Sequence, residues 1–346
     1  MAGQRHPADA QVFWMLVLSQ GVCDGASLAE RIARMEVSTA PPRSAEGPGR
    51  LRQMMREHPL SFFFLIAYGF SWILSVPAIM SAWGVLPSAM FVVFFTIKSF
   101  GPFVAAYVMT GVIEGREGIH RLRRSLRQVR AGWQWYVFIL IGIPALMLLG
   151  VAVLPGALAS FQGFPPNFSA VYLVTFVLIF FGGGPLGEEP GWRGFALPRM
   201  QPRFGPLKGT LLLGVLWVFW HLPDFLTVAQ RGGRGTDFAA LLTINLPIFF
   251  VMVMAMAVIF TWTFNHTRGS VFIAVLLHTS INAFGAVVGL FSALIVIGTD
   301  LAICIAMVVP ALLIVVLTRG RLGYEPGQGR SVESAHGGSR AGLAGE

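Results

Sequence analysis

The sequence predicts an all-α membrane protein, a polytopic bundle of about eight transmembrane helices with both termini on the cytoplasmic side. Of its 346 residues, 55% are hydrophobic and only 12% are charged, which is about half the charged share of an average soluble protein. Apolar stretches long enough to cross a bilayer recur from about residue 60 onward. Because hydrocarbon offers no hydrogen-bond partners to backbone amides, these stretches must form helices rather than open strands.

The elements follow from the apolar runs in chain order. Residues 1–58 are polar and hold one apolar stretch, 12–18, that is too short to span, so we expect a cytoplasmic N-terminal segment. The transmembrane domain is expected over 59–318. The Gly- and Ser-rich residues 319–346 are expected to form a disordered tail. The eight predicted spans are 60–82, 90–113, 134–154, 170–187, 207–226, 238–264, 269–289 and 293–317.

Basic residues determine the predicted orientation. Lys and Arg concentrate in the N-terminal segment, the loop 116–130, the fourth and sixth loops and the start of the tail, whereas the loop 156–169 carries no charge. These basic segments all fall on one side, which is therefore cytoplasmic, with Arg231 and Arg234 as the basic exceptions on the other side. The formal net charge of +9 is explained by this topology rather than by nucleic-acid binding. We expect an integral, multi-pass protein of a bacterial cell membrane, with the lipid bilayer around it.

Ionisable side chains inside spans are costly and indicate function, and the segment GEEPGWRGFALPRM, 187–200, begins with three of them, Glu188, Glu189 and Arg193. Glu189 and Arg193 are four residues apart, so on a helix they share a face and can pair. Glu188 points about 100° away and lacks that partner, which suits a general base that takes a proton from water. The alternative is an interfacial loop in which these side chains contact lipid headgroups.

Three more polar side chains lie in two later spans. His221 ends the sequence WVFWH, and His278 and Asn282 are four residues apart in LLHTSINAF, so they project from one helix face. The alternatives are a hydrogen-bonded packing role for His221 and an interhelical hydrogen bond for the other two. Together with Glu188, they supply a base, imidazoles that orient water or donate protons, and an amide that can bond a developing oxyanion. This is the inventory for hydrolysing an amide bond.

With these residues in this order, the chain resembles the CPBP intramembrane proteases, a family that includes the type II CAAX prenyl proteases and the Abi bacteriocin-immunity proteins. EEPGWR at 188–193 is similar to the family's EExxxR, WVFWH at 217–221 to FxxxH, and HTSIN at 278–282 to HxxxN. The similarity covers about residues 165–290. Trp217 stands where the motif has Phe, which we interpret as a packing variation.

The resemblance implies an intramembrane endopeptidase that acts on a peptide or protein substrate entering from the membrane or the cytoplasmic side. It implies that Glu188 activates the attacking water with help from His221. It also implies that His278 and Asn282 stabilise the oxyanion. It further implies that the pair of Glu189 and Arg193 shapes the site. Alternatives of another class are a membrane transporter with a midplane polar site and a non-catalytic membrane scaffold. No inverted repeat is visible, and the motifs are intact.

Two alternatives are open for a cofactor. Glu188, His221 and His278 could hold zinc, as His₂Glu sites do in soluble peptidases. However, the sequence contains no HExxH, and a metal-free mechanism with Glu188 as the base is favoured. Asn282 is a poor zinc ligand, which favours its role at the oxyanion.

The predicted spans place Glu188 and His221 at different depths in the membrane. A fourth span over 170–187 leaves Glu188 near the cytoplasmic surface, whereas His221 lies about 14 residues, or about 20 Å, into its own span. If the motifs form one site, we expect the fourth span to start later than residue 170 and to continue through Trp192 and Phe195. The glycines at 182–184 would then form a kink and not an end.

Two further charges lie inside spans far from the motifs. Lys98 and Asp300 are both eight or nine residues, by rough count, from the outer ends of parallel spans, so they reach similar depth. We expect them to form a structural ion pair between the second and last spans. The alternative is that Lys98 extends its ammonium alone towards the interface.

Overall fold

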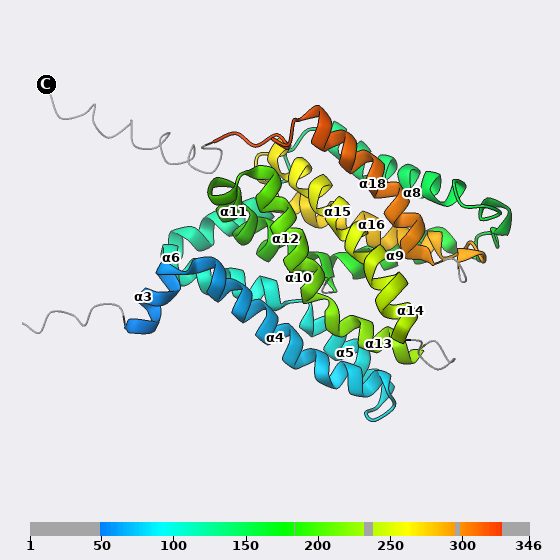
Figure 1. Cartoon of the computed structure of the whole chain (residues 1–346), viewed down its shortest axis with the longest axis horizontal. Helices are drawn as coiled ribbons and strands as arrows, with labels where there is room; N and C mark the ends of the chain where they lie inside the picture. The colour runs from blue at the N-terminus through cyan, green and yellow to red at the C-terminus, as the bar shows by residue number, and fades with distance from the viewer. Residues whose placement is uncertain (1–48, 183, 232–237, 295–297, 327–346) are drawn as a thin grey trace, which may run out of the picture. The chain divides into compact units, whose positions relative to one another are not determined.

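The computed structural model describes residues 49–182, 184–231, 238–294 and 298–326, which are helical almost throughout (Figure 1). Most of the predicted N-terminal segment, 1–48, and of the predicted tail, 327–346, lies outside the described residues. The chain divides into two units, Met1–Gln53 and Met54–Glu346. Of the first unit, residues 49–53 are described, and all but the first of them belong to helix α3.

Long helices are interrupted by short irregular turns, and no β-strand occurs in the described ranges, where Phe161 and Phe291 form an isolated β-bridge. Single π-helical turns interrupt three of the membrane runs: η1 (Phe138–Gly142), η3 (Trp192–Ala196) and η4 (Leu241–Asn245). The helices are α3 (Arg50–Glu57), α4 (Pro59–Ala82), α5 (Ser88–Lys98), α6 (Gly101–Leu126), α7 (Trp133–Val137), α8 (Ile143–Ala152), η2 (Leu158–Ser160), α9 (Phe168–Phe181), α10 (Gly184–Gly191), α11 (Leu197–Phe204), α12 (Pro206–Trp220), α13 (Leu222–Arg231), α14 (Phe238–Ala240), α15 (Leu246–His266), α16 (Val271–Val288) and α18 (Thr299–Leu317).

Eight helical runs among the described residues are long and apolar enough to cross a membrane. They match the eight predicted spans in order, so the all-α multi-pass bundle is confirmed, while the side that each terminus faces stays a prediction. The second run extends beyond its apolar stretch because α6 continues as a polar helix, and the fourth run extends to Phe204. The runs are Pro59–Ala82, Ser88–Leu126, Trp133–Ala152, Phe168–Phe204, Pro206–Thr227, Leu241–His266, Val271–Val288 and Thr299–Leu317.

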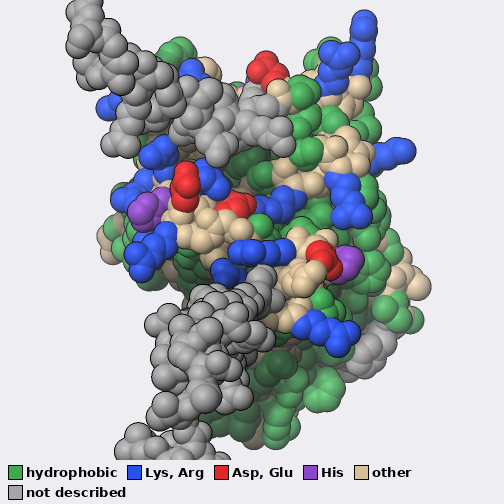
Figure 2. Space-filling view, turned by 90° about the vertical axis from the view of Figure 1, so that its left-hand side faces the viewer, with side chains coloured by type: hydrophobic (Ala, Val, Ile, Leu, Met, Phe, Trp, Pro, Cys, Tyr) green, Lys and Arg blue, Asp and Glu red, His purple; other side chains and the backbone are tan. Residues whose placement is uncertain are grey.

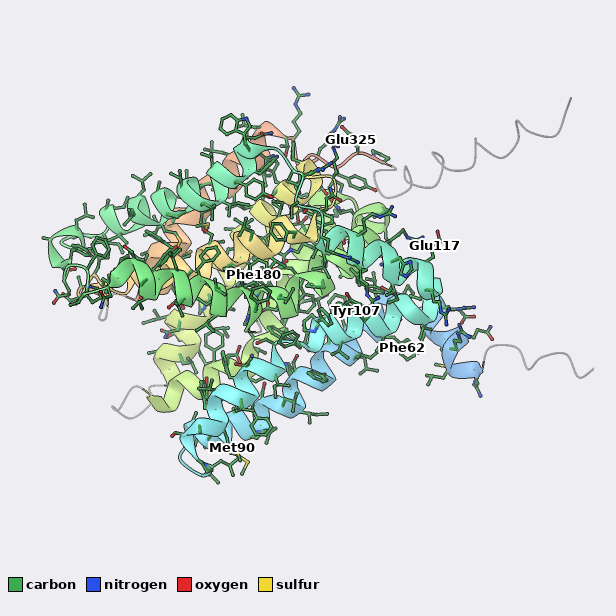
Figure 3. The ribbon with its side chains drawn as sticks, turned by 180° about the vertical axis from the view of Figure 1, so that it is seen from behind. Phe62, Met90, Tyr107, Glu117, Phe180 and Glu325 are labelled. Atoms are coloured by element: carbon green, nitrogen blue, oxygen red, sulfur yellow. The ribbon has the colours of Figure 1, made fainter. Side chains whose placement is uncertain are left out.

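The outer helices carry apolar side chains on their exposed faces, as a surface against lipid requires. No residue of α9 is buried, and Met90 projects from α5 at the molecular surface (Figure 3). By contrast, 72% of the apolar window of α16 is buried inside the protein. The helix that carries His278 and Asn282 is therefore the central one of the bundle.

Lys and Arg side chains gather at the end of the second unit where α6, α11 and α15 terminate (Figure 2). Arg121 there pairs with Glu114 at 2.7 Å and with Glu117 at 3.4 Å, and Glu117 lies on the outer surface of α6 (Figure 3). Arg199 of α11 also pairs with Glu114. This gathering at one end agrees with the basic segments that the sequence places on the cytoplasmic side.

Two glycines let α10 pack directly against the link between α5 and α6. Gly187 and Gly191 are four residues apart and share a helix face, the spacing that allows close approach of membrane helices. A Cβ atom at Gly187 would lie 2.5 Å from the carbonyl oxygen of Ser99, and one at Gly191 would lie 2.4 Å from Cβ of Pro102. This close packing fixes α10 against its neighbour and so fixes the direction in which Glu188 points.

Candidate functional site

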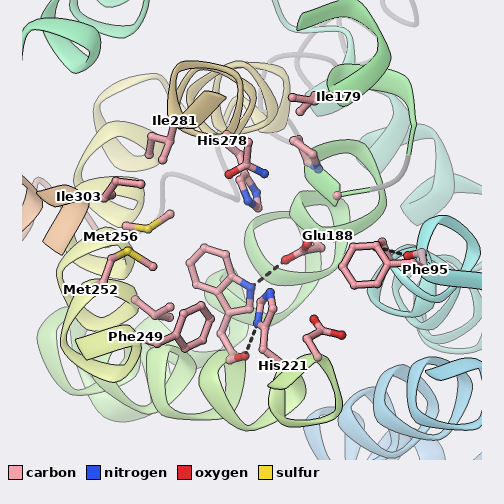
Figure 4. A pocket seen from close by; sticks show the side chains of 18 of the residues that line it. Phe95, Ile179, Glu188, His221, Phe249, Met252, Met256, His278, Ile281 and Ile303 are labelled. Carbon is pink, nitrogen blue, oxygen red and sulfur yellow. Dashed lines mark hydrogen bonds between the residues drawn. The ribbon is translucent and has the colours of Figure 1, made fainter. Parts of the chain in front are cut away.

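A cavity of about 640 Å³ opens between α5, α9, α10, α12, α13, α15, α16 and α18, and the polar residues of all three motifs meet at it (Figure 4). Two of the six predicted site residues, Glu189 and Arg193, are fully buried behind its wall at 0% exposed. The residues that line the cavity are the other four, Glu188, His221, His278 and Asn282.

The fourth run places Glu188 at the depth of His221. Helix α9 ends at Phe181, and after a break the chain continues as α10, η3 and α11 to Phe204. Glu188 lies 16 residues before Phe204 (204 minus 188), and His221 lies 15 residues after Pro206 (221 minus 206), so the two antiparallel runs bring them level. The prediction that the span continues past Trp192 is confirmed, whereas its expected start after residue 170 is wrong, because the run begins at Phe168. The kink expected at 182–184 includes residue 183, which lies outside the described residues.

Glu188 is buried, at 4% exposed, and it is held by neutral donors. Its Oε2 atom accepts hydrogen bonds from Nε1 of Trp217 at 2.8 Å and from Nε1 of Trp192 at 3.3 Å. The expectation that this carboxylate has no partner is therefore wrong in detail. The expectation that Glu188 does not pair with Arg193 is confirmed, because the guanidinium of Arg193 pairs with Glu189.

The other oxygen of Glu188 faces open space that it shares with Asn282. A Cβ atom built on Gly184 would lie 3.9 Å from Oε1 of Glu188 and 3.7 Å from Nδ2 of Asn282, with no other neighbouring heavy atom inside 4 Å. A carboxylate oxygen and an amide donor thus flank the same small volume. Such a volume suits a reacting group that needs a base on one side and a donor on the other.

Glu189, Arg193 and His278 form a buried charge cluster. Nη1 of Arg193 lies 3.2 Å from Oε1 and 3.0 Å from Oε2 of Glu189, so the pairing predicted from the four-residue spacing is confirmed. Nδ1 of His278 lies 2.8 Å from Oε1 of the same carboxylate. Glu189 therefore connects the first motif to the third, a contact that the sequence spacing could not indicate.

Aromatic rings enclose the guanidinium of Arg193. Its Cζ atom lies 4.4 Å from the ring centroid of Trp217 and 4.3 Å from that of Phe260. A cation between two ring faces gains electrostatic stabilisation that partly replaces lost hydration. The guanidinium is thus held between two rings behind the cavity, and its Nε and Nη2 atoms have no hydrogen-bond partner among the described residues.

Hydrogen bonds determine which nitrogen of each histidine remains available. Nδ1 of His221 lies 2.9 Å from the carbonyl oxygen of Trp217, and because a carbonyl only accepts, Nδ1 carries the proton. In the neutral ring, Nε2 of His221 is then an acceptor. Nδ1 of His278 donates to Glu189, which orients that ring by a carboxylate, and Nε2 is its remaining polar atom.

The zinc alternative receives no support from the positions of the donor groups. Within the ranges that the structure describes, no three His, Cys, Asp or Glu side chains are grouped so that they could hold a metal ion. The set of Glu188, His221 and His278 is thus not assembled as a ligand set. The function proposed below assigns no role to a metal.

The predicted ion pair between Lys98 and Asp300 is wrong. Nζ of Lys98 lies 2.5 Å from Oδ1 and 2.7 Å from Oδ2 of Asp224. The helix breaks at His221, and α13 begins with Asp224 in its first turn, close to the end of α5. Asp300 is at the start of α18 instead. Asp224 was missed, although its position inside the predicted span 207–226 could have indicated it.

The chain is similar to proteins of a known family. Residues 169–284 match the family described as type II CAAX prenyl endopeptidase Rce1-like. Over 152 residues the chain is 31% identical to CAAX prenyl protease 2 of Methanococcus maripaludis, in an alignment that covers 42% of this chain and 53% of that protein. The chain thus spans about half the length of this relative. Both findings confirm the resemblance that the three motifs predicted. The relative is archaeal, so a bacterial membrane stays a prediction.

Proposed function

From the premise that residues 169–284 match the type II CAAX prenyl endopeptidase family, we propose that the chain is an intramembrane endopeptidase whose general base is Glu188. The observation that carries this proposal is the asymmetric environment of that carboxylate. One oxygen accepts two indole N–H groups, while the other faces a cavity next to the amide of Asn282. A transporter or scaffold has no need of such an arrangement.

The proposed reaction begins with a water molecule beside Oε1 of Glu188. The carboxylate takes a proton from this water as its oxygen attacks the carbonyl carbon of the scissile peptide, which forms a C–O bond and a tetrahedral oxyanion. The oxyanion collapses, the C–N bond breaks, and protonated Glu188 returns its proton to the leaving nitrogen. The products are a carboxylic acid and an amine, and the enzyme is regenerated.

His221 orients the water in this proposal. Because its Nδ1 proton is bonded to the carbonyl oxygen of Trp217, its Nε2 lone pair can accept the second hydrogen of the water. Two acceptors, Nε2 of His221 and Oε1 of Glu188, then fix the direction of the attacking oxygen lone pair. Positioning of this kind supplies a large share of the catalysis in hydrolases.

Asn282 and His278 stabilise the oxyanion in this proposal. Their side chains are four residues apart on α16 and both line the cavity. Nδ2 of Asn282 is a neutral donor. Because Nδ1 of His278 is bonded to Glu189, Nε2 of that ring can donate to the oxyanion only in the imidazolium form. Arg193 balances the charge of Glu189, so this carboxylate orients the imidazole without competing for the water proton.

The substrate in this proposal is an apolar peptide segment that enters from the membrane or the cytoplasmic side. Much of the cavity wall is apolar, with the side chains of Ile179, Phe249, Met252, Met256 and Ile303 among its lining. Methionines adapt to irregular apolar groups. A prenylated C-terminal CAAX sequence fits this chemistry and is the substrate that the relative's name indicates.

The test compares peptide termini in membranes that carry the wild-type chain, Glu188→Gln or Glu117→Gln at matched expression. Gln at 188 keeps an oxygen that can accept from both indoles, so the fold is retained while the base is lost. General-base removal typically costs about 10²- to 10⁴-fold in rate. Glu117 is exposed on α6, so its Gln variant should match the wild type. Undiminished cleavage by the Glu188→Gln protein would refute the proposal.

A second arm identifies the substrate class. The purified protein in liposomes is given a synthetic peptide that ends in a CAAX sequence, with and without a prenyl group on the cysteine. Cleavage of only the prenylated peptide supports prenyl recognition by the apolar wall. Equal cleavage of both peptides supports a general membrane peptidase.

A further inference from the structure

We propose that Trp217 is a positioning residue that, together with Trp192, holds Oε2 of Glu188 and thereby selects Oε1 as the oxygen that takes the proton. This inference rests on the proposed function, because it concerns the base of that reaction. It changes the interpretation of Trp217, which from the sequence alone looked like a packing variation where the family motif has Phe. A phenyl ring has no donor, whereas the indole of Trp217 donates to Glu188.

Both indole donors bond the same carboxylate oxygen. Nε1 of Trp217 is 2.8 Å and Nε1 of Trp192 is 3.3 Å from Oε2 of Glu188. An ionised carboxylate has about two lone-pair sites on each oxygen, so the two indoles occupy those of Oε2. The two sites of Oε1 remain for the water. The carboxylate cannot exchange its oxygens by rotation without breaking both bonds.

Packing prevents the indole of Trp217 from moving away. Its side chain is 2% exposed, and the guanidinium of Arg193 covers one ring face at 4.4 Å. Its ring centroid lies 5.8 Å from Phe260 and 5.6 Å from His278, both in edge-to-face geometry. The donor is therefore pre-oriented by the same buried cluster that orients His278. The shorter of the two bonds to Glu188 comes from Trp217, the residue that departs from the motif.

Trp192 alone would hold Glu188 less well. Its bond of 3.3 Å is longer than the common range for N–H···O hydrogen bonds. With Phe at position 217, one lone-pair site of Oε2 is free and the carboxylate can rotate about its terminal torsion. Either oxygen could then face the water, and only a fraction of molecules would hold the productive geometry. The consequence is a lower kcat with substrate binding unchanged.

The chain provides a matched control three residues later. Trp220 is also buried, at 1% exposed, but its Nε1 has no hydrogen-bond partner among the described residues. Trp220→Phe therefore removes the same volume as Trp217→Phe and no hydrogen bond to Glu188. The ring of Trp220 also packs edge-on against His221 at 4.6 Å and against Trp192 at 5.8 Å, so this control itself perturbs the site. A larger kcat loss in Trp217→Phe than in Trp220→Phe therefore reports the donor and not the lost indole volume.

The experiment measures kcat, KM and the thermal midpoint of the purified protein in liposomes with a cleaved peptide. We expect Trp217→Phe to lower kcat about tenfold or more, the size expected for one bond to a charged group, with KM within about twofold. Trp220→Phe should lower kcat by less than about threefold. Replacing Trp217 with benzothienylalanine, which keeps the bicyclic shape and lacks the N–H, should reproduce the loss even if the Phe variant folds poorly.

The outcomes separate this inference from the proposed function. Equal kcat losses in the Trp217→Phe and Trp220→Phe proteins, or full kcat in the benzothienylalanine protein while Glu188→Gln is inactive, would overturn the role of Trp217 and leave the base assignment intact. Wild-type turnover by Glu188→Gln would overturn the proposed function itself. A higher KM of the Trp217→Phe protein with an unchanged kcat would also overturn the positioning role.

Discussion

Two walls of one cavity contain buried charged side chains, and these side chains have different kinds of partner on the two walls. On the wall built by α10, η3, α12 and α16, Arg193 and His278 are both bonded to Glu189, while neutral indoles bond Glu188. On the wall built by α5 and α13, Lys98 and Asp224 contact each other at 2.5 Å. The first wall keeps one carboxylate oxygen open to the cavity, and the second neutralises itself.

The kind of partner explains the difference. A neutral N–H group stabilises a carboxylate without cancelling its charge, so Glu188 keeps a free oxygen for the role of base that we propose for it. An ammonium group cancels the charge of its partner and orders it at the same time, so Asp224 is not available as a base. Burial of charge therefore does not by itself identify a catalytic wall. Our proposal assigns the chemistry to the first wall because a carboxylate oxygen there has an unused lone pair next to open space.

The largest effect is expected from Arg193→Met. This change leaves Glu189, which is 0% exposed, without its cation, and breaking a fully buried ion pair costs about 3–5 kcal/mol. Unfolding of the detergent-solubilised protein followed by thermal or denaturant titration measures it. The double variant Glu189→Met, Arg193→Met should regain much of the stability but not the activity, because His278 then lacks the acceptor for its Nδ1 proton. Activity in the double variant would contradict this role of the first wall.

A smaller effect is expected from Lys98→Met. Lys98 is 2% exposed, but the side chain of Asp224 is 17% exposed, so water screens the charge that is left behind. We expect a loss of about 2 kcal/mol in the free energy of unfolding. Lys98→Met combined with Asp224→Leu should return to within about 1 kcal/mol of the wild type and should regain activity. If the double variant regains its stability but is inactive, the second wall takes part in the chemistry, and the contrast between the two walls does not hold.

An effect on rate alone is expected from Gly184→Ala. The new methyl group would lie 3.9 Å from Oε1 of Glu188 and 3.7 Å from Nδ2 of Asn282, inside the volume where the water and the scissile carbonyl must fit. We expect at least a tenfold loss of kcat/KM, or about 1.4 kcal/mol, with stability unchanged or slightly raised because Ala favours helix. Gly111→Ala on α6, where the methyl group would meet no atom within 4 Å, is the control and should keep wild-type activity.

Contacts within one helix could be predicted from the sequence, and contacts between helices could not. The eight spans follow from the apolar runs because lipid forces helical backbone, and Glu189 pairs with Arg193 because four residues bring side chains to one face. The bond from His278 to Glu189 joins residues 89 apart, and that from Trp217 to Glu188 joins residues 29 apart. Such bonds depend on the rotation of each helix about its axis, which hydropathy does not determine.

The error at Lys98 has the same cause. Equal depth made Asp300 a reasonable partner, since depth is what a count of residues along a span can provide. The true partner, Asp224, is 126 residues away and reaches Lys98 because the helix breaks after Trp220 and α13 begins at Leu222. A break at HLP changes the direction of the chain, and no periodic pattern indicates where the next helix will point.

The smallest effect is expected from Arg121→Ala, at the polar end of α6. Arg121 contacts two carboxylates, Glu114 at 2.7 Å and Glu117 at 3.4 Å, so by number of partners it resembles the cluster around Arg193. Its side chain is 43% exposed and that of Glu117 is 77% exposed, however, and solvent-exposed ion pairs contribute about 0.2–1 kcal/mol. We expect the thermal midpoint to fall slightly at low salt, to be unchanged at high salt, and activity to equal that of the wild type. A loss comparable to that of Arg193→Met would mean that the number of charges, and not their burial, sets the energy difference between regions of this protein.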